Sequence, residues 1–355
     1  MTRAAAALLL AALAAAPAAA FRPLTPPAPE FPAGDAWLNA AQPLPLSLLK
    51  KRKAVVVAFL DPTDLHSIRV IPVLKAWFER YALSQLMVIG VVTPRLDVQK
   101  DAVWVRRQVE RDGIEFPVVL DTDRRLWDAY GARGWPALFL VDRRGRVVYD
   151  HLGEGGYGDF ESQIRQALGE LVDWDDLPPA VSYPDPKSSG CGRSTPDVPM
   201  GARAKTPIRR LDEDYSLHRM LMTESRQGEL ATRGRWELEP DGMRLDQKNP
   251  VQTAFVRVVF EATQALAVLA PPPDGSPTRF FVKMDDQWLY QGEQGRDVRF
   301  DDDGRSYVTV REERLYDLAR ARGEQPHMLA VIPDRRGGGV FGFQFADACL
   351  ATDLP

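Results

Sequence analysis

The sequence predicts two domains, an α/β domain with a mixed sheet flanked by helices and an all-β sandwich that follows it. In the first half of the chain, short apolar runs suited to buried strands alternate with amphipathic helical stretches. A proline-rich stretch then covers residues 173–208, and beyond about residue 230 the helical pattern gives way to short alternating runs separated by Asp-Gly, Gly-Gly and Pro turns. The first pattern indicates an α/β layer fold, and the second is typical of a β-sandwich.

Composition and length are consistent with this division. The chain has 355 residues, of which 45% are hydrophobic, which is enough for roughly two cores. The formal net charge is −4 and no long basic run occurs, which excludes nucleic acid as a main partner. The triple glycine at 337–339 lacks the strand–helix context of a phosphate-binding loop, and we expect no cofactor.

The N-terminal residues 1–20 have the pattern of a cleaved signal peptide. They combine Arg3 with an apolar run and end in three alanines. We therefore expect a periplasmic or secreted protein in a compartment where disulfides persist, with an uncleaved anchor as the alternative. No other stretch approaches the ~20 apolar residues of a membrane span, so none is expected in the mature chain.

Residues 21–34 form a proline-rich lead-in, and residues 35–172 carry the α/β pattern. The continuous apolar run VVVAFL predicts a strand buried on both faces. Asp64 is a plausible N-cap for the following helix, and Pro72 should kink it. The expected strands are 53–60, 86–92, 116–121, 135–142 and 147–150, and the expected helices are 64–82, 98–112, 124–130 and 160–171. After the linker at 173–208, residues 209–355 form the expected sandwich.

Several segments resemble a known family. The segments WLNAAQPLPLSLLKKRKAVVVAF, VIGVVTPRL and EFPVVLDTDRRLWDAYGARGWPALFLVDRRGRVV resemble the thioredoxin-like domain of TlpA/DipZ-type periplasmic proteins, in the redoxin and AhpC/TSA-related group. RGRWEL, FVRVVFEATQALAVLAPP, RFFVKMDD and FGFQF are similar to the jelly-roll, carbohydrate-module-like C-terminal domain of the DipZ type. The resemblance implies a thioredoxin-like fold and thiol–disulfide exchange. It also implies a cis peptide bond at Trp135-Pro136, beside a groove that binds an extended peptide.

The chain departs from this family at the active site. Where the family has Cys-x-x-Cys, this sequence has Asp64, Leu65, His66 and Ser67. Disulfide exchange needs a thiolate nucleophile, so we expect none at this site. Peroxidase chemistry is excluded on the same ground, because the α/β domain contains no cysteine.

Three interpretations of the substituted site stay open. Asp64 and Ser67 can act as helix caps. His66 and Ser67 can form an acid–base and nucleophile pair, although adjacent helical side chains diverge by about 100°. The groove near Trp135 and Pro136 can bind a peptide or small ligand.

The two cysteines, Cys191 in the linker and Cys349 after the last expected strand, lie outside the α/β domain. In an oxidising compartment they are candidates for a structural disulfide. Two free thiols and a redox-active pair are the alternatives.

No metal site is expected, because the four histidines show no ligand spacing. The run Asp301–Asp303 before Gly304 favours a turn over a calcium loop. Sugar rings stack on exposed aromatic side chains, whereas most aromatics belong to cores. The aromatic candidates of the second domain are Trp236, Trp288, Tyr290, Tyr307 and Tyr316.

These observations favour a thioredoxin-like protein without its catalytic cysteines, which binds or positions a partner. A peptide or protein near Pro136 is the expected partner of the first domain, and carbohydrate that of the second. One alternative is a thiol–disulfide oxidoreductase that uses Cys191 and Cys349. The other is a glycan-binding protein whose first domain is a spacer.

Overall fold

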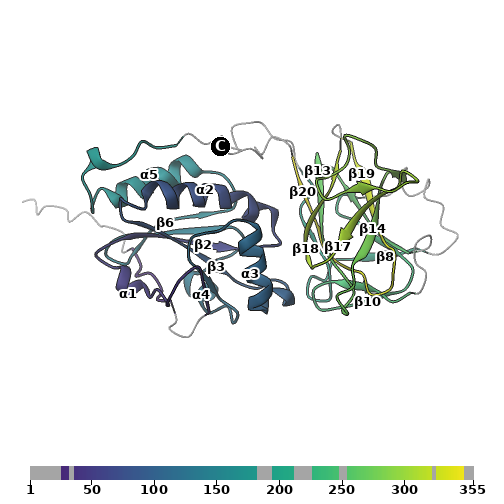
Figure 1. The fold of residues 1–355 in the computed structure, drawn as a ribbon, viewed down its shortest axis with the longest axis horizontal. Coiled ribbons are helices and arrows are strands. Elements are labelled where there is room, and N and C mark those ends of the chain that lie inside the picture. Colours follow the sequence, from purple (N-terminus) through teal and green to yellow (C-terminus); the bar gives the residue numbers. More distant parts are fainter. Residues whose placement is uncertain are drawn as a thin grey trace, which may run out of the picture.

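The computed structural model describes residues 25–31, 36–181, 194–211, 226–247, 254–321 and 325–347. An α/β domain and a β domain lie next to each other along the long axis of the molecule (Figure 1). The expected signal peptide and both cysteines, Cys191 and Cys349, fall outside these residues. Within the described ranges, no helix has the length and apolar character needed to cross a membrane.

The α/β domain is a six-stranded mixed sheet with helices on both faces, as the sequence predicts. The strand order is β1-β4-β3-β2-β5-β6, with β2 parallel to β3 and antiparallel to β5. Buried side chains of α2, α3 and α5 form one core, and those of α1 and α4 form the core on the opposite face. The strands are β1 (Trp37–Leu38), β2 (Ala54–Leu60), β3 (Leu86–Val92), β4 (Val118–Leu120), β5 (Ala137–Val141) and β6 (Val147–Leu152). The helices are α1 (Leu46–Leu49), α2 (Leu65–Tyr81), α3 (Ala102–Arg111), α4 (Arg125–Tyr130) and α5 (Tyr157–Leu168).

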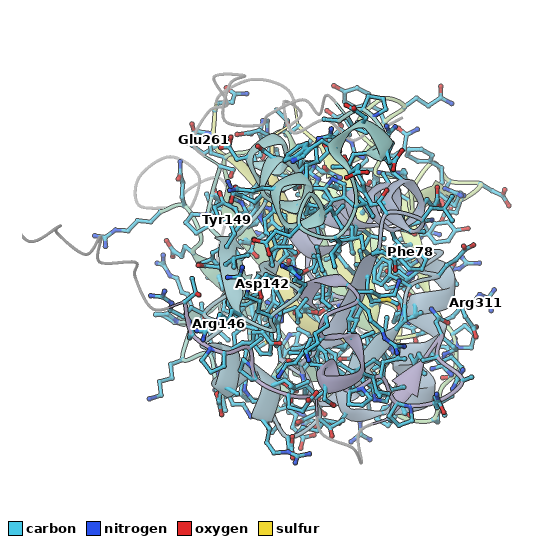
Figure 2. The ribbon with its side chains drawn as sticks, turned by 90° about the vertical axis from the view of Figure 1, so that its left-hand side faces the viewer. Phe78, Asp142, Arg146, Tyr149, Glu261 and Arg311 are labelled. Carbon is cyan, nitrogen blue, oxygen red and sulfur yellow. The ribbon has the colours of Figure 1, made fainter. Side chains whose placement is uncertain are left out.

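Strand β2 shows why the apolar runs were informative. All seven of its residues are buried, because a strand at the centre of a sheet covered on both faces has no solvent side. Figure 2 views the molecule from the α/β end and labels Phe78 of α2 and Tyr149 of β6. Both are partly buried and pack on the core that α2 shares with α5.

One predicted helix, 98–112, is divided in two. A 3-10 turn, η1 (Asp97–Lys100), precedes α3, and Asp101 lies between them with an extended backbone. The Asp101 carboxylate accepts a hydrogen bond from the Val103 amide at 2.8 Å. This N-cap starts a new helix, which the amphipathic pattern alone could not show.

The β domain is a sandwich of two antiparallel-dominated sheets, as predicted. A six-stranded sheet has the order β10-β11-β20-β13-β18 with β7 beside β20, and an eight-stranded sheet has the order β16-β17-β14-β19-β12-β9-β8 with β15 beside β14. The main core lies between the two sheets. Because β7 pairs with β20, part of the 173–208 stretch packs on the sandwich.

The strands of the six-stranded sheet are β7 (Val198–Pro199), β10 (Trp236–Leu238), β11 (Met243–Leu245), β13 (Gln264–Ala270), β18 (Arg314–Arg320) and β20 (Gly339–Ala346). Those of the other sheet are β8 (Ile208–Arg210), β9 (Leu230–Arg233), β12 (Phe255–Phe260), β14 (Thr278–Met284), β15 (Gln287–Trp288), β16 (Arg299–Phe300), β17 (Ser306–Val310) and β19 (His327–Pro333). A short 3-10 turn, η2 (Trp174–Asp176), follows α5.

Candidate functional site

The substituted residues form the start of α2, directly after the central strand β2. The Asp64 carboxylate caps the helix by accepting a hydrogen bond from the Ser67 amide at 2.7 Å. The Ser67 hydroxyl oxygen accepts a hydrogen bond from the Asp61 amide at 3.1 Å. Both side chains are buried, with Asp64 6% and Ser67 1% exposed. The structure therefore supports the capping interpretation.

Asp61, which the sequence analysis did not single out, is the polar centre of this site. It is fully buried and accepts hydrogen bonds from the Thr63 amide at 2.7 Å and the Thr63 hydroxyl at 2.6 Å. Arg95 forms an ion pair with it at 2.7 Å, and the Gln99 side chain donates a further bond. The Asp-x-Thr spacing is a local turn signature that could have identified the first two contacts.

The buried carboxylate of Asp64 has altered acidity. Burial away from water and the nearby charge of Asp61 raise its pKa from 3.8 to about 6. Arg95 and the Ser67 amide oppose this shift without cancelling it. The charged form of Asp64 therefore loses its contact with water when the side chain caps the helix.

His66 points away from Ser67 toward a different partner. Its Nδ1 lies 2.8 Å from a carboxylate oxygen of Glu154, which precedes α5. That hydrogen bond raises the pKa of His66. Since Ser67 contacts Asp61 and His66 contacts Glu154, the two residues do not form the acid–base and nucleophile pair that the sequence left open.

The β domain covers this end of α2. Gln344 of β20 accepts a hydrogen bond from the Leu65 amide at 2.7 Å and donates one to the Thr63 carbonyl at 2.7 Å. Leu65 is 7% exposed and packs in an apolar cluster with β-domain side chains, among them Leu266 and Phe341. Further contacts also join the domains, among them the Arg69 guanidinium to Gln264 at 3.1 Å, the Asp97 amide to Asp241 at 2.6 Å, and the Trp104 indole to the Glu313 carbonyl at 2.9 Å.

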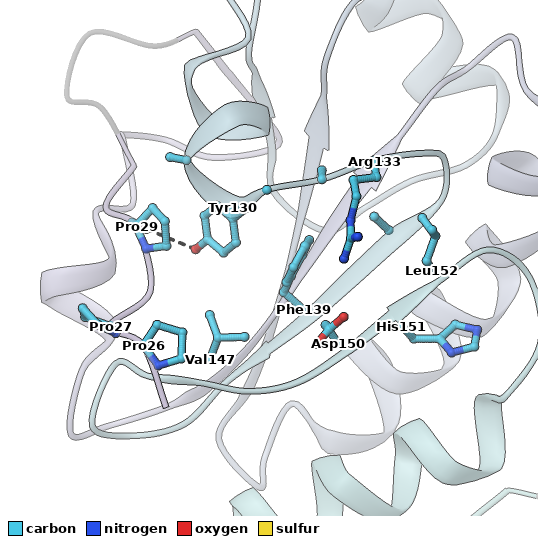
Figure 3. A pocket seen from close by; sticks show the side chains of 14 residues that line it. Pro26, Pro27, Pro29, Tyr130, Arg133, Phe139, Val147, Asp150, His151 and Leu152 are labelled. Atoms are coloured by element: carbon cyan, nitrogen blue, oxygen red, sulfur yellow. Dashed lines mark hydrogen bonds between the residues drawn. The ribbon is translucent and has the colours of Figure 1, made fainter. Parts of the chain in front are cut away.

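The Trp135-Pro136 bond is cis, as the resemblance implies. Pro136 is buried, and its carbonyl accepts a hydrogen bond from the Gly153 amide at 2.8 Å. Trp135 packs on Trp127 with ring centroids 4.2 Å apart. The next residue, Ala137, is one of those that line the cavity in Figure 3, which has a volume of about 280 Å³.

The other candidates have separate outcomes. Asp301 accepts hydrogen bonds from the amides of Asp303 at 3.1 Å and Arg305 at 2.8 Å, which is the expected turn. In the part of the chain that the structure describes, no group of three or more His, Cys, Asp or Glu residues could hold a metal.

The aromatic candidates do not share one surface. Tyr316 is core, only 1% exposed, whereas Tyr290 is 56% exposed. Trp288 and Tyr307 are half-buried, and their rings are covered by Lys283 at 4.3 Å and Arg279 at 4.8 Å. Trp236 lines a separate cavity. Lys283 and Arg279 already occupy two of the ring surfaces that a sugar would need.

Two family models match the chain, one in each domain. The "AhpC/TSA family" matches residues 25–150, and the "Thioredoxin like C-terminal domain" matches residues 204–346. Together with the fold, they define the class: a thioredoxin-like domain of redoxin type followed by a β-rich domain. The two matches, in this order along the chain, support the predicted resemblance to redoxins of the TlpA/DipZ type.

Individual proteins are similar over part of the chain. Protein DipZ of Mycobacterium bovis is 34% identical over 172 residues, which cover 48% of this chain and 23% of DipZ. Thiol-disulfide oxidoreductase YkuV of Bacillus subtilis is 24% identical over 147 residues, 41% of this chain and 97% of YkuV. A crystal structure of a thiol-disulfide isomerase from Corynebacterium glutamicum aligns at 25% identity and a TM-score of 0.35, covering 41% of this chain and 97% of that chain.

Proposed function

We propose that this protein is a redox-inactive, thioredoxin-like scaffold of the cell exterior or periplasm, in which the former active-site edge binds the protein's own β domain. One observation carries the proposal: the residues at the Cys-x-x-Cys positions, Asp64 and Ser67, lack sulfur and are engaged in buried hydrogen bonds, with Asp64 as the N-cap of α2. A thiolate is the required nucleophile of disulfide exchange, and this edge has none.

The domain contacts support a docking role for the same edge. The side-chain amide of Gln344 contacts the backbone on both sides of Asp64, at Leu65 and Thr63. The side chain of Gln344 thus accepts one backbone hydrogen bond and donates another, as the backbone of a neighbouring strand would. A disulfide partner would have to reach the same backbone, where the β domain already lies.

An insulin-reduction assay tests the proposal, with the D64C/S67C double variant as a probe of access. We expect no turnover from the wild type. We expect the double variant to react slowly with insulin and to react faster when Gln344→Ala loosens the domain contact. Gln287→Ala is the matched control, because Gln287 is exposed on β15. Wild-type turnover that is lost in Cys191→Ser or Cys349→Ser would overturn the proposal.

The name of one relative, a thiol-disulfide oxidoreductase, supports that class as the alternative. In this chain, such a reaction would have to use Cys191 and Cys349, its two cysteines. Mass spectrometry without reduction distinguishes the cases. An intact mass that is two hydrogens lower than the mass of the reduced chain supports a disulfide. Alkylation of both cysteines without prior reduction shows two free thiols and rules the disulfide out. A Cys191 pKa near that of a free thiol, with no reactivity toward disulfides, counts against redox use.

The proposed location rests on the N-terminal residues 1–20 and on their signal-peptide pattern. Sequencing the N-terminus of protein recovered from the outer compartment tests it. A mature chain that begins near residue 21 is the expected result, and a cytoplasmic chain that retains Met1 is the contrary one.

A peptide partner of the first domain would bind the sheet face beyond Pro136. The cavity there includes Tyr130, Phe139 and the 56% exposed Leu152 (Figure 3). Strand β6 is the last of its sheet, and the Val147 amide at its start donates to the Pro26 carbonyl at 3.0 Å. The outer edge beyond Val147 can accept an extended peptide. In a peptide-display selection, we expect Leu152→Asp to abolish capture and Val103→Asp, an equally exposed apolar site on α3, to leave it unchanged.

A further inference from the structure

A cavity of about 600 Å³ opens at one edge of the β domain, far along the chain from the α2 site. It lies where β8, the last strand of the eight-stranded sheet, meets β10, the last strand of the six-stranded sheet. Both strands are labelled at the same side of the β domain in Figure 1. Its volume is within the range of small-ligand sites in proteins, about 300–1,000 Å³.

The cavity has an aromatic wall with a fixed orientation. Trp236 of β10 is half-buried and packs partly on the sandwich core. Its indole N–H donates a hydrogen bond to the Arg233 carbonyl at 2.9 Å. The bond anchors the polar edge of the ring, so what the indole offers a ligand is apolar ring surface.

The charged side chains that the structure describes around the cavity are all cationic: Arg210, Arg233 and Arg235. Arg235 is held by Asp246, through an ion pair at 3.0 Å and two bonds to its carbonyl. Arg210 is exposed, and among the described residues no carboxylate forms an ion pair with it. Its neighbour Arg209 instead pairs with Glu229 at 3.5 Å.

Hydrogen-bonding groups complete the lining. The hydroxyls of Thr206 and Thr232 and the side chain of Gln247 also line the cavity. The side-chain oxygen of Gln247 accepts a hydrogen bond from the backbone amide of Arg235 at 3.2 Å. The cavity thus offers an apolar ring surface, two hydroxyls, one side-chain amide and an arginine that has no carboxylate partner among the described residues. These groups suit a ligand with an apolar ring face, hydroxyls and an acid group. Sugar acids combine these three features.

We propose that this cavity binds an acidic saccharide, with a uronate ring against Trp236 and its carboxylate on Arg210. The inference goes beyond the redox-inactive role and does not depend on it, since the β-domain residues that contact α2 in the described structure are not among those that line the cavity. Arginine binds carboxylates through two parallel N–H groups, so uronate should bind better than the neutral sugar of the same shape.

Isothermal titration of the full chain with tri-galacturonate, and with the neutral galactose trisaccharide, tests the proposal. We expect tri-galacturonate to bind at least tenfold more tightly than the neutral sugar, a ratio that added salt reduces. We expect Arg210→Ala to remove this preference and Trp236→Ala to weaken both ligands. Arg209→Ala is the control, because alternate strand residues face opposite sides.

Three results would overturn the proposal: no binding of tri-galacturonate, equal affinity for both sugars, or Arg210→Ala binding like the wild type. Trp236→Phe keeps an aromatic wall and should retain most affinity, which separates loss of the site from loss of folding. Tighter binding of single-stranded DNA than of tri-galacturonate would also count against it, since that outcome indicates a general polyanion surface.

Discussion

Replacing Asp64 by asparagine should stabilise the protein at neutral pH. Burial and the neighbouring Asp61 raise the pKa of Asp64 from 3.8 to about 6. The native state therefore binds a proton between these values while the unfolded chain does not. The stability that this group contributes is fully present below pH 3.8 and is lost as the pH rises through about 6.

The size of the effect follows from the shift. About two pKa units at 1.36 kcal/mol each amount to about 3 kcal/mol of unfolding free energy, as an upper bound. Asparagine caps helices about as well as aspartate, so Asp64→Asn keeps the bond to Ser67 and removes the buried charge. The gain should grow between pH 3.8 and 6 and stay level above.

Urea unfolding of wild type and Asp64→Asn at pH 4.0 and 7.5 checks this expectation. Asp101→Asn is the control, because Asp101 caps α3 in the same way while its side chain is exposed. A variant less stable than the wild type at pH 7.5, or a gain of equal size at both pH values, would refute the reasoning. The first result would mean that the carboxylate's charge is needed at this helix end.

Three further predictions concern other buried contacts. Burial raises the pKa of Glu313 to about 8, so Glu313→Gln should gain stability over the wild type progressively between pH 4.5 and 8, measured by urea unfolding; a pH-independent difference would contradict this. Gln344→Ala leaves the Leu65 amide and the Thr63 carbonyl without their partner and should cost about 2–4 kcal/mol, against no change in Gln287→Ala. Gly201→Ala should lower the melting temperature more than Gly275→Ala, because both have positive φ but only at Gly201 would a Cβ lie 2.4 Å from a backbone nitrogen; equal losses would contradict the steric argument.

The sequence predicted those features that depend on neighbouring residues. The apolar run of 86–92 corresponds to β3 residue for residue, because a buried strand must be apolar throughout. The cap at Asp64 was predicted for a similar reason, since its partner is three residues away. The short β1 and α1 were missed because they carry no periodic pattern.

The contacts that define the candidate site could not be predicted from local pattern. Glu154 is 88 residues from His66, and Gln344 is 279 residues from Leu65. Glu154 lies in a polar, glycine-rich segment, and Gln344 is the one polar side chain of the apolar strand β20, but neither setting indicates which distant residue is the partner. Only the fold brings them to the start of α2, and a single sequence contains no record of such distant pairing.

The position of Gln344 has a consequence for biosynthesis. The last helix of the α/β domain, α5, ends at Leu168, whereas the residue that covers the start of α2 belongs to β20, the last strand among the described residues. During translation, the start of α2 is therefore uncovered until residue 344 has been made. A chain that terminates before residue 344 would present Leu65 and two unpaired backbone groups, Leu65 N–H and Thr63 C=O, to solvent. The domain junction thus distinguishes a polypeptide that contains β20 from one that ends before it.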